Sequence, residues 1–63
     1  MANNSDIELI NKLVAFCKDR NFTIDQIASF VGMTRGWASL ITNGKIKSLK
    51  FSTRSRIEKA LGI

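Results

Sequence analysis

Apolar residues near the start of the chain recur at the spacing of one face of an α-helix, with polar residues between them. The apolar members are Ile7, Ile10, Leu13, Val14 and Cys17. Ser5 and Glu8 have the spacing of a capping box, in which two side chains bind free N–H groups at a helix start. The pattern predicts a first helix from Asp6 to Arg20, preceded by a flexible segment over residues 1–5.

A second, shorter helix is predicted directly after this one. Thr23 and Gln26 repeat the capping-box spacing. The apolar residues that follow are Ile27, Ala28, Phe30 and Val31. Gly32 can adopt the left-handed conformation that ends a helix without steric cost. The second helix is therefore predicted over residues 24–31.

Thr34 is placed to cap a third helix, because a threonine hydroxyl accepts a hydrogen bond from a free N–H group in the first turn. The apolar residues of this helix are Trp37, Ala38, Leu40 and Ile41. Asn43 and Gly44 are typical of a helix end. We predict the third helix at about residues 34–42.

The last part of the chain predicts a loop and one more helix. Residues 45–51 have no regular period, and the loop is expected to place three apolar side chains on the core, namely Ile46, Leu49 and Phe51. Ser52 is expected to cap a helix over residues 53–61, with Gly62 behind it. Its inward residues are Ile57, Ala60 and Leu61. The fold class is all-α, with four or at most five helices in one domain over residues 6–63.

Composition narrows the class of protein. Sixty-three residues with a net charge of +5 suit one small basic domain. The single cysteine, Cys17, excludes an internal disulfide, and one thiol without any histidine excludes a usual zinc site. No carboxylates have acid–base spacing, so we expect no catalysis, metal or cofactor. Without a membrane-spanning run or a signal-peptide pattern, a cytoplasmic location is expected.

The positive charge is concentrated in the second half of the chain. Residues 1–34 have a net charge of −1, whereas residues 35–63 carry +6 with Glu58 as their single acid. Five basic residues lie within twelve positions: Lys45, Lys47, Lys50, Arg54 and Arg56. This asymmetry indicates a surface that binds a polyanion, and lysines that contact phosphates add affinity without base information.

The second and third predicted helices have the spacing of a helix-turn-helix, in which the second helix of the pair enters the DNA major groove. The helix-turn-helix motif covers twenty positions, and Ile24 is the first of them. The small residue Ala28 allows the two helices to approach, and Gly32 supplies the turn. The contact between the helices is assigned to Ile27, Val31, Ala38 and Ile41.

Four short motifs carry a resemblance to a known family. They are Val31-Gly32-Met33-Thr34, Asn43-Gly44-Lys45-Ile46-Lys47, Lys50-Phe51 and Ala60-Leu61-Gly62-Ile63. The chain resembles the helix-turn-helix DNA-binding domains of lambdoid phage repressors and Cro proteins, from about Thr23 to Ile63. The resemblance implies a transcription regulator of a phage or mobile element that binds a double-stranded operator in the bacterial or phage-infected cell.

The resemblance also implies roles for single residues. Base contacts are implied for Thr34, Arg35, Gly36 and Leu40. Contacts to the DNA backbone are implied for Asn43, Lys45, Lys47 and Lys50. In this family the third helix contacts base edges, and the turn and loop behind it contact phosphates.

The chemistry of these residues leaves several roles open. Arg35 in the first turn can bind guanine bidentately, a contact that contributes ~1 to 3 kcal/mol of discrimination, or it can bind a phosphate. Thr34 caps its helix, contacts a phosphate, or places its methyl group against thymine. Ser39 lies one turn after Arg35 on the same face, so we add it to the base-contacting set. Gly36, which costs about 1 kcal/mol inside a helix, indicates close approach of another backbone, such as DNA.

Trp37 has three open roles: contact with the DNA backbone through its indole N–H, packing over the first helix, and binding of a protein partner. The third role supports a rival function, a protein-interaction module on the same fold that binds a repressor or another regulatory protein. The oligomeric state is also open, and exposed apolar residues would allow a weak homodimer or a dimer that forms on DNA. The candidates for that interface are Leu49, Phe51 and Ile63.

Overall fold

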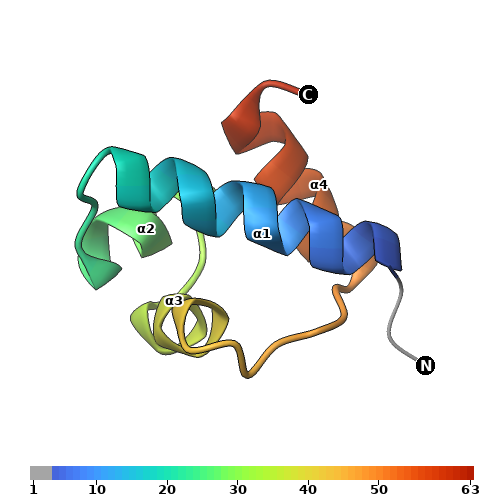
Figure 1. Ribbon diagram of the computed structural model, residues 1–63, viewed down its shortest axis with the longest axis horizontal. Coiled ribbons are helices and arrows are strands. Elements are labelled where there is room, and N and C mark those ends of the chain that lie inside the picture. The colour runs from blue at the N-terminus through green and yellow to red at the C-terminus, as the bar shows by residue number, and fades with distance from the viewer. Residues whose placement is uncertain (1–3) are drawn as a thin grey trace.

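The chain folds into four α-helices in the computed structural model, which describes residues 4–63. They are α1 (Asn4–Asp19), α2 (Ile24–Val31), α3 (Arg35–Thr42) and α4 (Phe51–Leu61). Within residues 4–63 no strand is present. Figure 1 shows α1 crossing the molecule, with α2 and α3 on one side of it and α4 behind it. The all-α fold class with four helices is confirmed.

The boundaries of α2 and α3 follow from local hydrogen bonds. The Gln26 N–H donates to Thr23 Oγ1 over 3.2 Å, and the Thr23 N–H donates to Gln26 Oε1 over 2.8 Å, which completes the predicted capping box. Gly32 ends α2 with a φ of +79°. The Trp37 N–H donates to Thr34 Oγ1 over 3.2 Å at the start of α3. The predicted helix over residues 24–31 and both caps are confirmed.

The predicted start of α1 is wrong. Asn4 and Ser5 belong to the helix rather than to a flexible segment, and residues 1–3 of that segment lie outside the described residues. Ser5 is therefore not the N-cap. Its Oγ lies 2.6 Å from Arg54 Nη2, so the hydroxyl accepts a hydrogen bond from α4 instead of capping α1.

The predicted start of α4 is also wrong, by two residues. The helix begins at Phe51 after Lys50, whose side chain forms no capping bond, and Ser52 is already helical. This register turns Thr53 and Ile57 inward. Because successive helical residues are about 100° apart, Phe51 points away from the face that contains Thr53. It is 86% exposed and is not the predicted core anchor.

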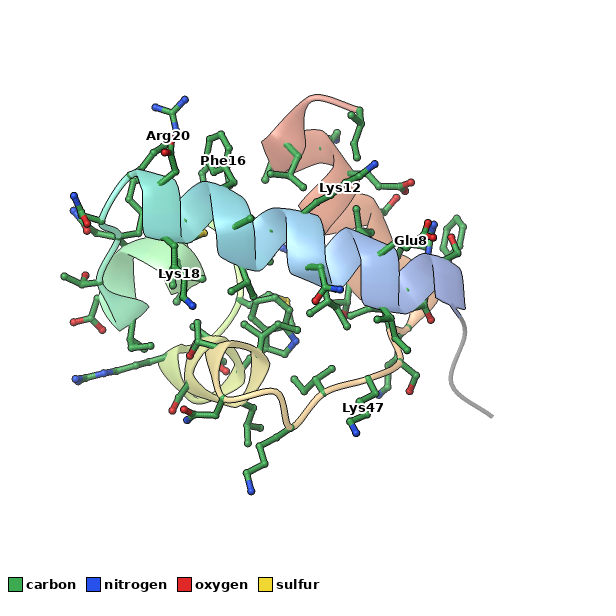
Figure 2. All side chains as sticks on the ribbon, in the orientation of Figure 1. Glu8, Lys12, Phe16, Lys18, Arg20 and Lys47 are labelled. Atoms are coloured by element: carbon green, nitrogen blue, oxygen red, sulfur yellow. The ribbon has the colours of Figure 1, made fainter. Side chains whose placement is uncertain are left out.

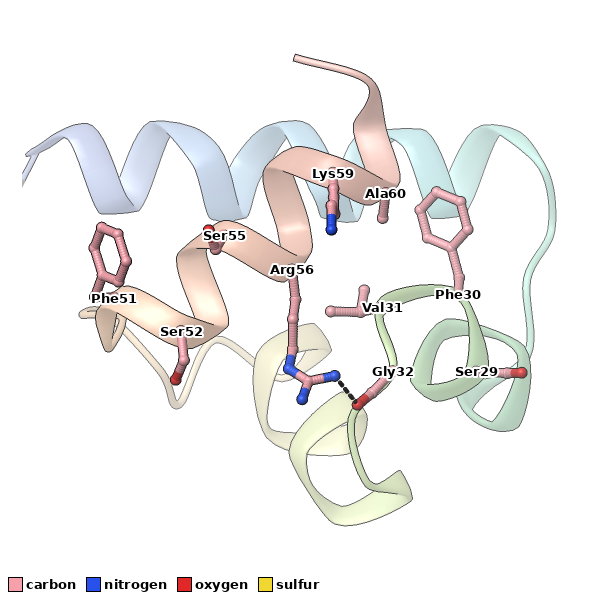
Figure 3. Close-up of a pocket in the computed structure, with 10 residues that line it drawn as sticks. All are labelled: Ser29, Phe30, Val31, Gly32, Phe51, Ser52, Ser55, Arg56, Lys59 and Ala60. Atoms are coloured by element: carbon pink, nitrogen blue, oxygen red, sulfur yellow. Dashed lines mark hydrogen bonds between the residues drawn. The ribbon is translucent and has the colours of Figure 1, made fainter.

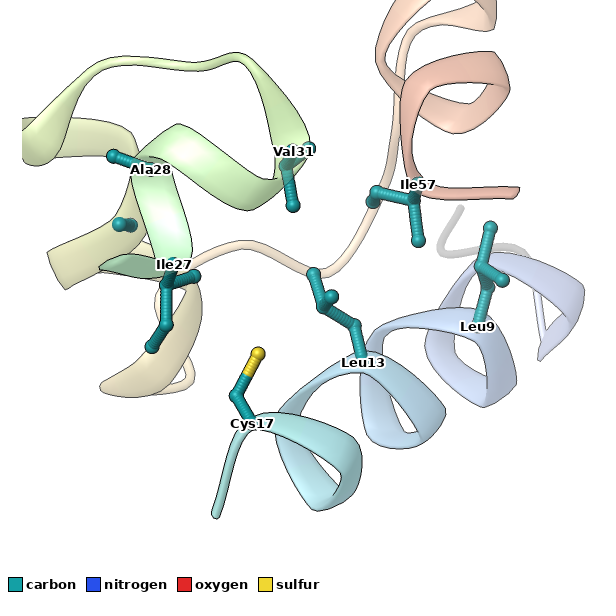
Figure 4. Packing of buried hydrophobic residues seen from close by; sticks show 8 residues of the cluster. Leu9, Leu13, Cys17, Ile27, Ala28, Val31 and Ile57 are labelled. Carbon is teal, nitrogen blue, oxygen red and sulfur yellow. The ribbon is translucent and has the colours of Figure 1, made fainter. Parts of the chain in front are cut away.

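The core lies where α1, α2 and α4 meet, and α3 closes it. Its buried members are Leu9, Leu13, Cys17, Ile27, Ala28, Val31, Ala38 and Ile57 (Figure 4). All the residues assigned to the contact between α2 and α3 are buried, including Ile41 at 1% exposure. The inner stripe of α1 is Leu9, Leu13 and Cys17 at intervals of four, and the sequence pattern missed Leu9 because Ile7 and Ile10 obscured it.

Three aromatic side chains close the end of the core between α1 and α2. Phe16 stacks on Phe30 with ring centroids 5.3 Å apart, and Phe22 packs edge-on against both rings. The Arg20 guanidinium lies over the Phe16 ring, 4.3 Å from its centroid. Such aromatic and cation–π contacts orient the short connection between the two helices.

Replacement of Ile57 by alanine tests this packing. Ile57 is fully buried, so we expect the free energy of unfolding to fall by about 2 to 5 kcal/mol through lost contacts and the cavity left behind. Urea unfolding followed by circular dichroism measures the change. Ile63→Ala is the control, since Ile63 is 68% exposed and a surface change alters stability by no more than about 0.5 kcal/mol. Equal effects of the two changes would contradict the assigned core.

Candidate nucleic-acid interface

Helix α3 has one buried and one exposed face. It buries Ala38 and Ile41 against the rest of the protein, while Arg35, Gly36 and Leu40 stay exposed. Leu40 is 48% exposed. The exposed face therefore combines one cation, one bare backbone position and one apolar side chain.

The other predicted base-contacting residues lie beside this face. Thr34 is exposed and its hydroxyl already accepts the hydrogen bond that caps α3. Ser39 is half-buried, and its Oγ lies 3.4 Å from Asn43 Nδ2, a long hydrogen bond along the helix. Both hydroxyls retain unused hydrogen-bonding capacity, because a hydroxyl has one donor and two acceptor sites.

Gly36 and Trp37 differ in their surroundings. A Cβ atom at Gly36 would meet no heavy atom closer than Thr34 Oγ1 at 4.0 Å. No part of the described chain therefore requires a glycine at this position. Trp37 is half-buried and packs against the core cluster, so packing accounts for part of its surface.

The chain after α3 turns sharply, and its first backbone N–H groups bind carbonyls of the last turn of the helix. Asn43 is the C-cap, and Gly44 follows with a φ of +72°. The Lys45 N–H donates to the Leu40 carbonyl over 3.0 Å, and the Gly44 N–H donates to the Ile41 carbonyl over 3.3 Å. These two bonds form a Schellman-type helix end, so the predicted closure at Asn43–Gly44 is confirmed.

The five clustered basic residues separate into two groups. Lys45, Lys47 and Lys50 are exposed and form no ion pair with any of residues 4–63. Arg54 and Arg56 bind the protein itself: Arg54 pairs with Asp6, and Arg56 Nη1 donates to the Gly32 carbonyl over 3.1 Å. Of the five, only Arg54 has its charge compensated by a carboxylate, because the Gly32 carbonyl that Arg56 binds is neutral. The three loop lysines are the members of the cluster whose side chains form neither an ion pair nor a hydrogen bond within residues 4–63. Figure 2 shows Lys47 on this loop.

Asp6 holds the basic loop in place, and sequence analysis missed it. The side chain is nearly buried, with the residue 6% exposed. Its Oδ2 accepts a hydrogen bond from the Leu49 N–H over 3.1 Å, and its Oδ1 accepts one from Arg54 Nη1. Glu58 adds a longer contact, 3.9 Å from Arg54 Nε. Asp6 lies three residues before Leu9, so helical spacing places it on the inner stripe of α1. This spacing was the signal in the sequence that could have identified it.

A shallow groove runs between α2 and α4 beside the α2–α3 turn (Figure 3). Arg56 crosses it to reach Gly32, and a Cβ atom at Gly32 would lie 3.0 Å from that guanidinium. Position 32 therefore favours glycine for two reasons, namely its left-handed backbone conformation and the close approach of Arg56. Arg56 thus links α4 to the turn that orients α3.

Other site chemistry is sparse in the described chain. Among residues 4–63 no three His, Cys, Asp or Glu side chains gather as they would around a metal ion. Burial raises the pKa of the Cys17 thiol, which is 2% exposed. No helix among these residues combines the length and apolar character needed to cross a membrane.

No protein-family model, curated protein or solved structure matches this chain. The resemblance to phage repressors and Cro proteins thus rests on the short motifs alone. The observed architecture is an all-α arrangement of four helices, and its exposed α3 face and lysine loop are the features from which a function is inferred.

Asp6→Asn tests the anchor of the loop. The change removes the nearer of two carboxylate partners of Arg54 and leaves Glu58, so we expect the free energy of unfolding to fall by about 1 to 3 kcal/mol and the Leu49 amide proton to exchange faster. Urea unfolding and hydrogen exchange measure the two effects. Glu8→Gln is the matched control, because Glu8 is an exposed acid on the same helix. A loss no larger than that of the control would show that Asp6 does not hold the loop.

Proposed function

We propose that this protein is a sequence-specific double-stranded DNA-binding transcription regulator with a helix-turn-helix formed by α2 and α3. The observation that carries the proposal is the exposed face of α3, followed directly by a loop with three lysines that form no ion pair within residues 4–63. An exposed helix face supplies contacts to base edges, and adjacent lysines supply contacts to phosphates. Both requirements of sequence-specific binding thus lie on neighbouring segments.

The diameter of an α-helix suits the major groove. A helix with its side chains is about 10 to 12 Å across, and the groove is about 12 Å wide, so an exposed helix such as α3 can lie in it. Arg35 in the first turn supplies the donors that guanine O6 and N7 accept, and Leu40 offers an apolar contact to a thymine methyl group. Gly36 allows the helix backbone to approach the groove floor, because its position carries no side chain.

The loop after α3 supplies the contacts to the DNA backbone. The side chains of Lys45, Lys47 and Lys50 provide charge, and Asn43 provides an amide donor beside the end of α3. Contacts of this kind position a protein on the duplex and contribute affinity that falls as salt rises. Trp37 is assigned to the same edge of α3, through the part of its surface that does not pack on the core.

A repressor or Cro-like role, with occlusion of a promoter, is proposed from the resemblance of the motifs. Such regulators bind as dimers to half-sites about 34 to 36 Å apart. The longest extent of this protein is 30 Å, so two copies fit side by side on successive turns of one DNA face. A weak dimer, or one that forms only on DNA, meets this geometric requirement.

The rival function, a protein-interaction module, has less support. It relied on Trp37 as an exposed anchor, and this side chain is half-buried against the core cluster. Three lysines beside α3 without an ion pair among the described residues are better explained by a polyanionic ligand.

Lys47→Ala tests the proposed function. Loss of one phosphate contact is expected to weaken binding to all duplex sequences alike and to reduce the slope of log affinity against log salt by about 0.9. Fluorescence anisotropy with labelled duplexes at several salt concentrations measures both quantities. Lys12→Ala is the control with the same charge change, since Lys12 lies on the side of α1 away from the Lys47 loop (Figure 2). Identical salt slopes for the wild type and Lys47→Ala would contradict the proposal.

A further inference from the structure

An ion pair links the starts of α2 and α3 on the exposed side of the protein. Arg35 Nε lies 3.3 Å from Asp25 Oδ1, and the two side chains are 76% and 70% exposed, respectively. Asp25 follows the first residue of α2, where the capping box of Thr23 and Gln26 fixes the backbone. Arg35 is the first residue of α3, which Thr34 caps. Both partners therefore project from well-defined helix starts.

The pair changes what Arg35 offers to a ligand. The carboxylate contacts Nε, and the two terminal nitrogens of Arg35 form no ion pair within residues 4–63. A planar guanidinium presents its donors in a rigid fork. An ion pair at Nε therefore limits the directions in which the two terminal nitrogens can point. The free donors match the two acceptors that guanine presents in the major groove.

The pair also reduces the attraction of Arg35 for phosphate. Phosphate binding depends on net charge, and an arginine next to a carboxylate has a local net charge near zero. Base recognition depends on hydrogen-bond geometry and keeps its donors. An exposed ion pair contributes little to folding stability, so loss of this pair can change binding without unfolding the protein.

We propose that Asp25 is a specificity-determining residue that orients Arg35 toward a guanine and suppresses its binding to phosphate. The inference rests on the proposed DNA-binding function. An acid in the first turn also stabilises a helix through the helix dipole. That role alone would change the stability of α2 and would leave base preference and salt dependence unchanged.

The test uses the full chain and a pool of random-sequence duplex DNA. Wild-type protein first selects its preferred duplex from the pool. Affinities are then measured for that duplex, for duplexes in which each G·C pair is replaced by A·T, and for an unselected duplex across salt concentrations. The same measurements are made on Asp25→Asn, Arg35→Lys and the control Glu8→Gln, which removes an equal charge from the exposed side of α1.

We expect Asp25→Asn to lower the preference for one G·C pair at least about fivefold and to steepen the salt slope on the unselected duplex by about 0.9, because Arg35 is released to phosphate. Arg35→Lys keeps the charge without the fork, so it is expected to lose the same preference while it retains affinity for the unselected duplex. Glu8→Gln is expected to change neither quantity.

Two results would overturn the inference while the DNA-binding proposal stands. In the first, Asp25→Asn keeps the G·C preference and the salt slope of the wild type. In the second, the wild type selects a duplex whose affinity depends on no G·C pair, or Arg35→Lys keeps the G·C preference of the wild type. These measurements on the wild type and on Arg35→Lys test the inference even if Asp25→Asn fails to fold. A wild-type protein that enriches no sequence from the pool would overturn the inference and the proposed function together.

Discussion

The buried carboxylate of Asp6 is the interaction on which the arrangement of the interface depends. It binds the Leu49 N–H at the end of the loop and Arg54 in α4, so it joins segments 43 and 48 positions away along the chain. A carboxylate that is 6% exposed requires such partners, because an unpaired buried charge is strongly unfavourable. The same bonds set the register of α4 and hold the far end of the lysine loop beside α1.

Helix α3 depends on the rest of the protein for its stability. Eight residues are too few for a helix that is stable alone in water. The folded protein supplies the missing stability in three ways: Ala38 and Ile41 are buried, Thr34 caps the helix, and glycine-containing turns fix both ends. The exposed face carries little of this stabilising role, so its residues are available for binding. The link from Arg56 to the Gly32 carbonyl extends the support to the turn itself.

Local chemistry made much of this fold predictable from sequence. The capping box at Thr23 and the left-handed glycine at Gly32 place α2 within its observed bounds, because both signals act over three or four residues. Long-range pairing could not be predicted in the same way. Arg54 was counted with the free cations, and Ser52 was assigned as a cap, because nothing in the local pattern indicates that Asp6 binds the first turn of α4. At the candidate interface, the exposed residues of α3 were expected from the resemblance of the short motifs, whereas the ion pair of Arg35 required the structure.

The exposed face of α3 and the loop behind it thus form one surface, on which the charged and hydrogen-bonding groups differ in the partners they have within the protein. The three loop lysines form no ion pair in the described part of the chain, Arg35 pairs with Asp25, and Arg54 and Arg56 bind other segments of the protein. The most direct test of this surface is an NMR titration of ¹⁵N-labelled protein with duplex DNA at low salt. We expect the largest amide shifts within residues 34–47 and little change over residues 8–16 of α1. Largest shifts on α1, or no shifts with DNA in excess, would contradict the assignment of α3 and its loop as the DNA-binding surface.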